Sequence, residues 1–485
     1  MQAANSQMSA SGSLDVVVNA LTAALGEDLV LSGQAIERFC RDWHGDVTTG
    51  AVAVVRPRTT AEVSAAVRAI RTLGLTIVPQ GGNTGLVLGC TPDDPTRQVV
   101  VSLERMTSVR RIDADDFSAV VEAGVILSDF KDRVEEAGLY FPLALGAQGS
   151  CRIGGNVSTN AGGINVLRYG MTRELVLGLE VVLPDGSIFD GLSTLRKDNR
   201  GVDLKQLFIG AEGTLGIITA VSVKLMPPAE KVATALVGLA ALSDAIELYR
   251  RARRDCCDLM SAFEFMPPVA FTLAQEAIPD LAMPMSADYP AYVLMEISGS
   301  GLVDIDDLMQ RFLEGVMEDG LVLDGVIAAS RGQAKSLWLF REGMNEGQAK
   351  RGAHLRTDVS VPLSRLAAFV ETAEAAVMAH LPDCTCVSYG HVGDGNVHLN
   401  VLPPGGLSAG EVQQRIYAAK SVINAVLDDF AGSISAEHGI GRLKKADFLS
   451  RLPAVQRQLL TAIKQAIDPD WIMNPGCQLN SDTDS

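Results

Sequence analysis

The sequence of 485 residues lacks the features that mark secreted, membrane-spanning and nucleic-acid-binding proteins. Lys and Arg total 41 against 58 Asp and Glu, a formal net charge of −17, so nucleic acids and anionic membranes would repel this chain. Residues 1–13 contain no Lys or Arg and no apolar core, which argues against a secretory signal peptide there. The most apolar later run, residues 232–242, is too short to cross a bilayer. We therefore expect a soluble, cytoplasmic protein that binds no nucleic acid.

The eight cysteines include no C-x-x-C pair. In a large chain without a signal peptide, we expect all of them to be reduced. Cys384 and Cys386 precede His391 and could bind a metal, but cysteines buried in a strand are the commoner case.

Composition and length limit the class of protein and the number of domains. Hydrophobic residues make up 47% and charged residues 20%, which indicates a globular protein, and the length suggests two to four domains. The first half begins with an apolar strand at 51–55. Thr59 and Glu62 follow at capping-box spacing, then a helical pattern that ends at Gly74 and a second strand at 75–79. This pattern predicts a β-α-β unit.

Three tracts rich in small residues belong to the same half. They span residues 80–89, 146–163 and 210–218. Glycine-rich backbone exposes N–H groups to an anion and can lie close to a large flat group. The first tract is neither a G-x-G-x-x-G fingerprint nor a P-loop. Each tract alone could be a surface turn, whereas the three together predict one extended cofactor cleft.

A domain boundary is predicted at Met226-Pro227-Pro228, because the pattern beyond it changes to strands that alternate with long helices. The predicted strands lie at 232–239, 261–265 and 292–297. The predicted helices lie at 243–254, 304–317, 336–346, 364–380, 408–430 and 453–468. This mixture predicts an α+β domain with a mostly antiparallel sheet.

Two of the six histidines flank a tight turn. His391 and His398 stand on either side of Gly393-Asp394-Gly395, where glycine takes positive φ without penalty. Residues 397–401 alternate apolar and polar, which predicts a strand that carries His398 and Asn400 on one face. Two converging imidazoles and a carboxylate from elsewhere would form a three-ligand metal site with an open position. From these residues alone, a turn with two hydrogen-bonded histidines is the somewhat commoner alternative. A third histidine stands beside a carboxylate in Glu437-His438.

These motifs resemble the FAD-dependent D-2-hydroxyacid dehydrogenases of the p-cresol methylhydroxylase and vanillyl-alcohol oxidase superfamily, and among them the enzymes for D-2-hydroxyglutarate, D-lactate and glycolate. The resemblance covers roughly residues 40–478. Its motifs are, in chain order, Pro79 to Gly85, Gly154-Gly155-Asn156 with Asn160 to Gly163, Gly210 to Gly216, Gly390 to His398, Ser435 to Gly441, and Asn474-Pro475-Gly476. Each motif is modest alone, but six in this order are specific.

The resemblance implies an α+β fold in two domains. An N-terminal tail and helix at 1–45 would precede a two-part FAD-binding domain at 46–228. A substrate domain with a largely antiparallel sheet at 229–478 would cap the isoalloxazine and carry the metal site, and a tail would follow at 479–485. The FAD would be noncovalent, since the tracts carry no histidine placed to link it. The implied cofactor residues are Pro79, Gly81, Gly82, Asn83, Thr84, Gly85, Gly146, Ser150, Gly154, Gly155, Asn156, Thr159, Asn160, Gly162, Gly163, Glu212, Gly213, Gly216, Ile217, Ile218 and Asn474.

The resemblance also assigns roles around the histidines. His391, His398 and Glu437 match metal ligands, usually read as Zn²⁺, and His438 matches a catalytic base that also contacts the substrate. The implied substrate contacts are completed by Arg341, Asn345, Arg356 and Asn400. Asn345 stands where the hydroxyglutarate enzymes have threonine, and Arg356 where lysine is expected, so the identity of the substrate stays open.

The expected chemistry is oxidation of a D-2-hydroxy acid to the 2-oxo acid, with the C2 hydride passing to flavin N5. A histidine base, a metal that lowers the hydroxyl pKa and an arginine fork for the carboxylate would serve this reaction. D-2-hydroxyglutarate is the first substrate we expect, with D-lactate and glycolate as alternatives. A metal hydrolase and a non-catalytic FAD-binding subunit are two alternative functions for this sequence. The electron acceptor could be an electron-transfer flavoprotein, a quinone, a cytochrome or O₂, and a homodimer is the default assembly.

Overall fold

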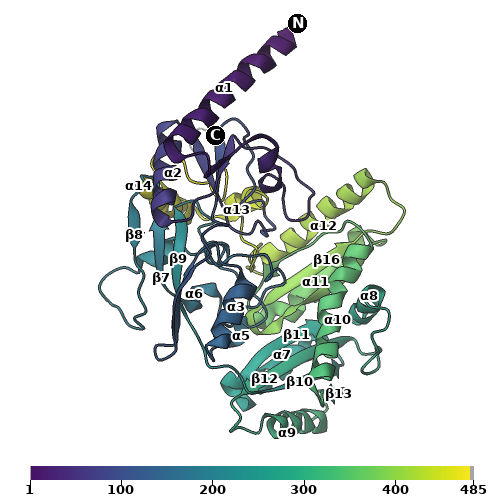
Figure 1. Cartoon of the computed structure of the whole chain (residues 1–485). Helices are drawn as coiled ribbons and strands as arrows, with labels where there is room; N and C mark the ends of the chain where they lie inside the picture. Colours follow the sequence, from purple (N-terminus) through teal and green to yellow (C-terminus); the bar gives the residue numbers. More distant parts are fainter. Residues whose placement is uncertain (1, 481–485) are drawn as a thin grey trace. The chain divides into compact units, whose positions relative to one another are not determined.

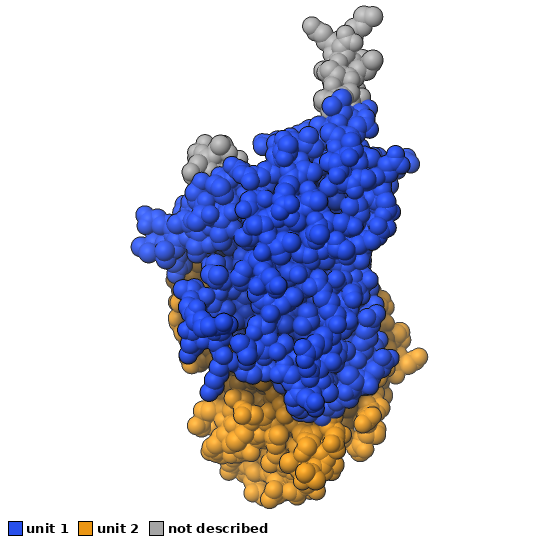
Figure 2. Space-filling model, turned by 60° about the vertical axis from the view of Figure 1, so that its left-hand side comes forward, with its two compact units in different colours: residues 1–163, 170–228, 437–485 blue, residues 164–169, 229–436 orange. Residues whose placement is uncertain are grey.

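The computed structural model describes residues 2–480, and the chain divides into two compact units (Figure 2). Unit 1 comprises residues 1–163, 170–228 and 437–485, and unit 2 comprises residues 164–169 and 229–436. Residues 1 and 481–485, which include most of the expected C-terminal tail, lie outside the described part.

The units depart from the expected domain boundaries in two places. Residues 437–480 were expected in the substrate domain, but they pack in unit 1, and residues 164–169 pack in unit 2. The N-terminus also differs. A tail was expected before the first helix in the segment 1–45, whereas helix α1 begins at residue 2 and spans Gln2–Leu25.

The first sheet of unit 1 contains the predicted β-α-β unit. Its strand order is β1-β2-β4-β3, with β2, β3 and β4 parallel and β1 antiparallel. The strands are β1 (Val30–Leu31), β2 (Ala53–Val55), β3 (Thr76–Gln80) and β4 (Gln98–Ser102). Helix α2 (Thr60–Thr72) begins as predicted, because Thr59 accepts a hydrogen bond from the Glu62 N–H. Helices α1 and α2 cover one face, and the 3₁₀ helix η1 (Gly33–Phe39) covers the other.

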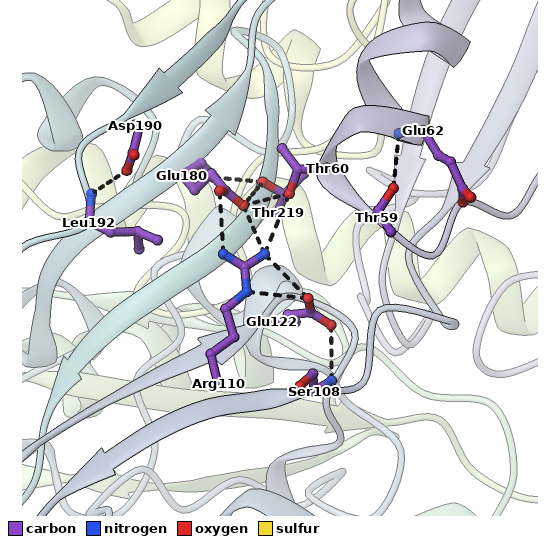
Figure 3. A network of polar contacts seen from close by, with 10 residues as sticks. All are labelled: Thr59, Thr60, Glu62, Ser108, Arg110, Glu122, Glu180, Asp190, Leu192 and Thr219. Carbon is purple, nitrogen blue, oxygen red and sulfur yellow. Dashed lines mark hydrogen bonds and ion pairs between the residues drawn. The ribbon is translucent and has the colours of Figure 1, made fainter.

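The second sheet of unit 1 is antiparallel, with the order β5-β6-β9-β7-β8. Its strands are β5 (Val109–Asp113), β6 (Ser118–Glu122), β7 (Val176–Val182), β8 (Ile188–Asp190) and β9 (Ile217–Lys224). Figure 3 shows a polar cluster on it. The Glu180 carboxylate accepts from Thr60 Oγ1 at 2.6 Å and Thr219 Oγ1 at 2.8 Å, and it pairs with Arg110 at 3.1 Å. This cluster ties α2 to strands β5, β7 and β9.

Short helices and the C-terminal segment complete unit 1. They are α3 (Leu127–Glu136), α4 (Ile153–Ser158), α6 (Thr172–Leu175), η2 (Leu204–Leu207), α13 (Lys445–Arg451) and α14 (Ala454–Ile467). The C-terminal segment returns to the first sheet, where the Asn474 N–H donates to the Ile77 carbonyl. Strand β3 therefore receives a contact from a residue about 400 positions later in the chain.

Unit 2 is built on a seven-stranded sheet, and each pair of neighbouring strands within it is antiparallel, as the sequence predicted. The order is β13-β10-β12-β11-β15-β16-β14. The strands are β10 (Lys231–Leu239), β11 (Met260–Met266), β12 (Ala291–Gly299), β13 (Asp324–Ile327), β14 (Val359–Ser360), β15 (Thr385–His391) and β16 (Asn396–Leu402). Long helices surround this sheet in Figure 1.

The two faces of the sheet carry separate apolar cores, because side chains alternate along each strand. Helices α7 (Leu242–Asp255), α9 (Ile305–Glu318), α11 (Leu366–His380) and α12 (Ala409–Asp429) supply one core. Helices α8 (Val269–Ala277) and α10 (Arg331–Lys350) supply the other. We call the second side the α10 face. The remaining elements are α5 (Val166–Tyr169), η3 (Cys257–Leu259), η4 (Leu363–Arg365) and η5 (Val392–Asp394).

No helix among residues 2–480 has the length and apolar character needed to cross a membrane. All eight cysteines are free thiols, as predicted.

Candidate active site

The first two small-residue tracts of unit 1 lie against each other. A Cβ atom on Gly82 would overlap the Ser150 carbonyl oxygen, and one on Gly81 would lie 3.5 Å from the Gly155 backbone. The loop after β3 therefore packs directly on the loop before α4. Only glycine permits this approach at Gly82, because any side chain would meet backbone there.

The second tract divides into packing positions and open positions. A Cβ on Gly154 would lie 2.5 Å from the Cβ of Ala123, so Gly154 seats α4 on the sheet. At Gly146 and Gly155 a Cβ would meet no atom within 4 Å, so the backbone borders open space. Buried Asn156 has a side-chain nitrogen without a hydrogen-bond partner among the described residues. A buried orphan donor beside open glycine backbone fits an acceptor-rich cofactor such as FAD.

The other polar residues of the predicted cofactor set brace this loop system. Asn83, at φ +55°, donates to the Arg41 carbonyl at 2.7 Å. Asn160, at φ +51°, accepts from the Arg173 N–H at 2.9 Å, and Thr159 Oγ1 donates to the Gly155 carbonyl at 3.1 Å. These left-handed asparagines stabilise the turns through their side chains.

The third tract holds unit 1 together. Buried Glu212 accepts from the Ile440 N–H at 2.8 Å and the Gly441 N–H at 2.7 Å, and its own carbonyl accepts from Asn474 Nδ2 at 2.8 Å. A Cβ on Gly213 would lie 2.9 Å from Pro79. On the other side of the tract, Gly216, Ile217 and Ile218 are packed at the start of β9. Glu212 and Asn474 thus use their side chains to fasten the C-terminal segment.

Glu437 and His438 lie in unit 1, where Glu437 accepts a hydrogen bond from the Gly163 N–H at 2.9 Å. A Cβ on Gly162 would lie 2.6 Å from the same carboxylate oxygen, so a side chain there would displace the carboxylate. This contact joins the end of the second small-residue tract to the Glu437-His438 pair. His438 is half-buried.

The two histidines of unit 2 belong to the β15–β16 hairpin, joined through η5 and Gly395 at φ +79°. Their ring centroids lie 6.0 Å apart with the planes at 75°. His398 pairs in register with Tyr389, and His391 lies beyond it at the end of β15. The two rings are therefore neighbours, and their convergence on one metal ion stays a prediction. In the part of the chain that the structure describes, no group of three or more His, Cys, Asp or Glu residues is arranged to hold a metal ion.

Each of these imidazoles is held at Nδ1 by a protein acceptor. His391 Nδ1 contacts the carboxylate of Glu264, its direct cross-strand partner on β11. His398 Nδ1 lies 3.2 Å from the Thr357 carbonyl oxygen. Because a carbonyl can only accept, Nδ1 of His398 carries a proton, and in the neutral ring the lone pair is on Nε2. A metal-binding histidine is typically held in this way at its other nitrogen.

Glu264 also binds Arg341. The Arg341 Nε atom donates to the second carboxylate oxygen at 2.9 Å, and its guanidinium lies 4.6 Å from the centre of the Tyr389 ring. Burial raises the pKa of the Glu264 carboxyl, but the charges of His391 and Arg341 outweigh it and lower this pKa to about 2. The side chain is therefore a carboxylate although only 1% of it is exposed.

A second set of hydrogen bonds lies along the α10 face. Asn400 Nδ2 donates to Gln348 Oε1 at 2.9 Å, and its Oδ1 accepts from the Thr357 N–H at 3.1 Å. The Tyr389 hydroxyl donates to Asn345 Oδ1 at 2.7 Å. Arg341, Asn345 and Gln348 lie on α10, which brings two of the predicted substrate residues to the strand residue Asn400.

Arg356 is placed differently. It is exposed on the loop before β14, and its Nε donates to His354 Nε2 at 3.3 Å. Burial lowers the pKa of His354, which favours the neutral ring that accepts this bond.

Glu264, Tyr389, Thr357 and Gln348 were missed by sequence reasoning. One feature of the sequence could have indicated Glu264: it is the single acidic residue in the apolar run Met260–Met266, where a buried charge needs partners. Tyr389 immediately precedes the glycine-histidine motif but carried no pattern of its own.

Comparison with known proteins gives the same picture. Residues 51–191 match the family described as FAD binding domain, and residues 228–477 match FAD linked oxidases, C-terminal domain. The chain is similar to D-2-hydroxyglutarate dehydrogenase, mitochondrial, of Bos taurus, with 40% identity over 90% of this chain and 78% of the relative. It is also similar to D-2-hydroxyglutarate dehydrogenase of Xanthomonas citri pv. viticola, with 37% identity over 91% and 92%.

The fold is similar to that of p-cresol methylhydroxylase with substrate bound, with a TM-score of 0.73 at 18% identity, covering 97% of each chain. The name of the bovine relative places that protein in the mitochondrion, and the cytoplasmic location of this chain stays a prediction. The two domain matches cover most of the sequence, and the predicted α+β fold and FAD-linked family are confirmed. The chain belongs to the FAD-linked oxidases and is an FAD-linked oxidoreductase homologous to the D-2-hydroxyglutarate dehydrogenases.

Proposed function

We propose that this protein oxidises a D-2-hydroxy acid, D-2-hydroxyglutarate first, to the 2-oxo acid. The single observation that carries the proposal is the α10 face of unit 2, where two imidazoles held at Nδ1 lie beside a buried arginine. The names of the similar proteins favour D-2-hydroxyglutarate among the 2-hydroxy acids.

We assign the binding of the cofactor to the three small-residue tracts, which lie within residues 46–228. Open backbone at Gly146 and Gly155, with the orphan donor of Asn156, supports a noncovalent FAD there. FAD supplies the hydride acceptor for C2 of the substrate. The side chains of Asn83 and Asn160 brace these loops by hydrogen bonds, which favours a cofactor site that is formed before FAD binds.

We assign a divalent metal ion to His391, His398 and Glu437, as the resemblance implies. Two imidazoles, each in the neutral form once a metal displaces its proton, and one carboxylate suit Zn²⁺ and several other divalent ions. A divalent ion held there supplies charge that lowers the pKa of the substrate hydroxyl. We assign the hydroxyl proton to the imidazole of His438, which follows Glu437 in the chain.

The substrate carboxylate is assigned to Arg341. Within residues 2–480 only its Nε atom forms a hydrogen bond, so the Nη1–Nη2 edge of the guanidinium is available to a carboxylate. Asn400 and Asn345 contribute amide groups nearby, and exposed Arg356 is the second cation assigned to a dicarboxylic substrate.

A substrate panel tests the proposal. Purified protein with FAD is assayed against D-2-hydroxyglutarate, L-2-hydroxyglutarate, D-lactate and glycolate with an artificial electron-accepting dye. We expect the highest kcat/KM with D-2-hydroxyglutarate. A higher value with D-lactate or glycolate would replace the substrate, and activity without flavin absorbance would contradict the flavin mechanism. The physiological acceptor, an electron-transfer flavoprotein, quinone, cytochrome or O₂, and a homodimeric state stay predictions.

A further inference from the structure

Glu264 is a carboxylate in a position where carboxylates are rare. It is the one acidic residue of β11, its side chain is 1% exposed, and apolar residues flank it on both sides along the strand. An isolated charge taken out of water costs several kcal/mol unless it is paired and hydrogen-bonded. A buried carboxylate therefore needs partners that offset the cost of its desolvation, and Glu264 has two, His391 and Arg341.

The two carboxylate oxygens serve different neighbours. Oε1 contacts His391 Nδ1 across the strand pair, and Oε2 accepts from Arg341 Nε at 2.9 Å on helix α10. The side chain therefore has no oxygen left over to bind a metal or take a proton from a substrate. Its effect must pass through the two residues that it holds.

Each contact prepares one of these residues. A carboxylate at Nδ1 holds a proton on that nitrogen, so in the neutral ring Nε2 is the nitrogen that carries the lone pair, and its basicity is raised. A carboxylate at Nε occupies one edge of the Arg341 guanidinium. The Nη1–Nη2 edge, which can bind a second carboxylate in bidentate fashion, is left for the substrate. Tyr389 fixes the plane of the guanidinium from below, because the cation lies over its ring.

We propose that Glu264 is a positioning residue that couples metal affinity to recognition of the substrate carboxylate. This inference rests on the proposed function, because it takes His391 as a metal ligand and Arg341 as the carboxylate anchor. One side chain sets the geometry of both, so a change at Glu264 weakens both functions together.

The test is Glu264→Gln in the FAD-loaded protein. Glutamine keeps the size but has a single acceptor oxygen, so it can accept from His391 or from Arg341 but not from both. Zn²⁺, Mn²⁺ and Co²⁺ are titrated by calorimetry into metal-stripped protein. We expect the affinity for metal to fall about 10–100-fold. The KM for the hydroxy acid should rise about tenfold, with a smaller change in kcat, because a charge-assisted contact is misaligned.

Glu296→Gln is the matched control. Glu296 lies on the neighbouring strand β12 and accepts from Thr234 Oγ1 at 2.6 Å and Trp338 Nε1 at 2.7 Å, without contact to a histidine. This variant should keep the parental metal affinity and KM. Glu264→Asp, which retains the charge on a shorter stem, should recover part of both losses.

The outcomes separate the two hypotheses. A parent protein that binds none of the three metals would overturn the metal site of the proposed function and this inference with it. A parent that binds metal, with a Glu264→Gln variant equal to it in metal affinity and KM, would overturn this inference alone. If the variant fails to fold, ¹⁵N NMR of histidine-labelled, metal-free parent, assigned with His391→Asn, decides. A proton on Nδ1 of His391 supports the inference, and a neutral ring protonated at Nε2 overturns it.

Discussion

Helix α14 buries a single side chain, and that side chain is Lys464. Its Nζ atom donates to the Thr214 carbonyl at 2.7 Å, to Asp468 Oδ2 at 2.6 Å and to the Met473 carbonyl at 2.9 Å. Burial lowers the pKa of Lys464, and the charge of Asp468 opposes this shift. The pair joins the C-terminal segment to the third small-residue tract of unit 1, so we predict that it is a main support of that unit.

The perturbation is Lys464→Met. Methionine fills much of the same space but leaves Asp468, which is fully buried, without its cation, and two carbonyls without a donor. Removal of one partner of a buried ion pair costs about 3–5 kcal/mol. At about 2–4 °C per kcal/mol for a large domain, Tm should fall by roughly 6–20 °C.

Differential scanning calorimetry of the FAD-loaded protein measures this change. In the double variant Lys464→Met with Asp468→Leu no charge is left buried, so part of the loss should return. The recovery is only partial, because Asp468 also accepts from the Ile472 and Met473 N–H groups. Arg311→Met removes an exposed i,i+4 pair with Asp307 and should shift Tm by less than about 2 °C. A shift for Lys464→Met no larger than this control would refute the reasoning.

Three further predictions concern the second sheet of unit 1 and the active site. Glu180→Gln should destabilise the protein by about 1–3 kcal/mol at pH 7, since the cluster in Figure 3 loses a charged acceptor. Burial raises the pKa of the Glu180 carboxyl, but hydrogen bonds from Arg110, Thr60 and Thr219 lower it by more, so the folded-state pKa lies below the unfolded value of about 4.3. The carboxylate therefore stabilises the fold fully above the unfolded pKa. This stabilisation is lost as pH falls through the folded-state pKa. Denaturant melts from pH 7 to pH 3 should show the gap to the parent closing below about pH 4, and a constant gap would contradict the assignment. EDTA should abolish turnover and Zn²⁺, Mn²⁺ or Co²⁺ should restore it, whereas indifference to chelation would argue against the metal. His438→Ala should keep flavin absorbance but lose turnover by about 10²–10⁴-fold in the dye assay, and parental turnover would remove the base assignment.

Local patterns were sufficient for most elements of the fold. The Thr59 cap, the capping box at Ser408 that begins α12, and the alternating strand around His398 all act within a few residues, so the sequence displays them directly. The faces of β15 and β16 also follow from alternation, which placed His398 and Asn400 on one side.

Contacts made across long separations were not visible in the sequence. Glu264 meets His391 and Arg341 only because β11 pairs with β15 and α10 packs across both, at separations of 127 and 77 residues. The return of residues 437–480 to unit 1 depends on the contact of Glu212 with Ile440 and that of Lys464 with Thr214, and each joins residues more than 200 positions apart. Periodicity reports which face is buried, and it carries no information on which distant residue meets that face.

Anaerobic addition of D-2-hydroxyglutarate to the FAD-loaded protein, with flavin absorbance followed in a stopped-flow spectrophotometer, tests the central claim most directly. The account predicts rapid bleaching of the flavin with one equivalent of 2-oxoglutarate formed per flavin, and no bleaching with L-2-hydroxyglutarate. An oxidised flavin that persists in the presence of D-2-hydroxyglutarate, D-lactate and glycolate would contradict it.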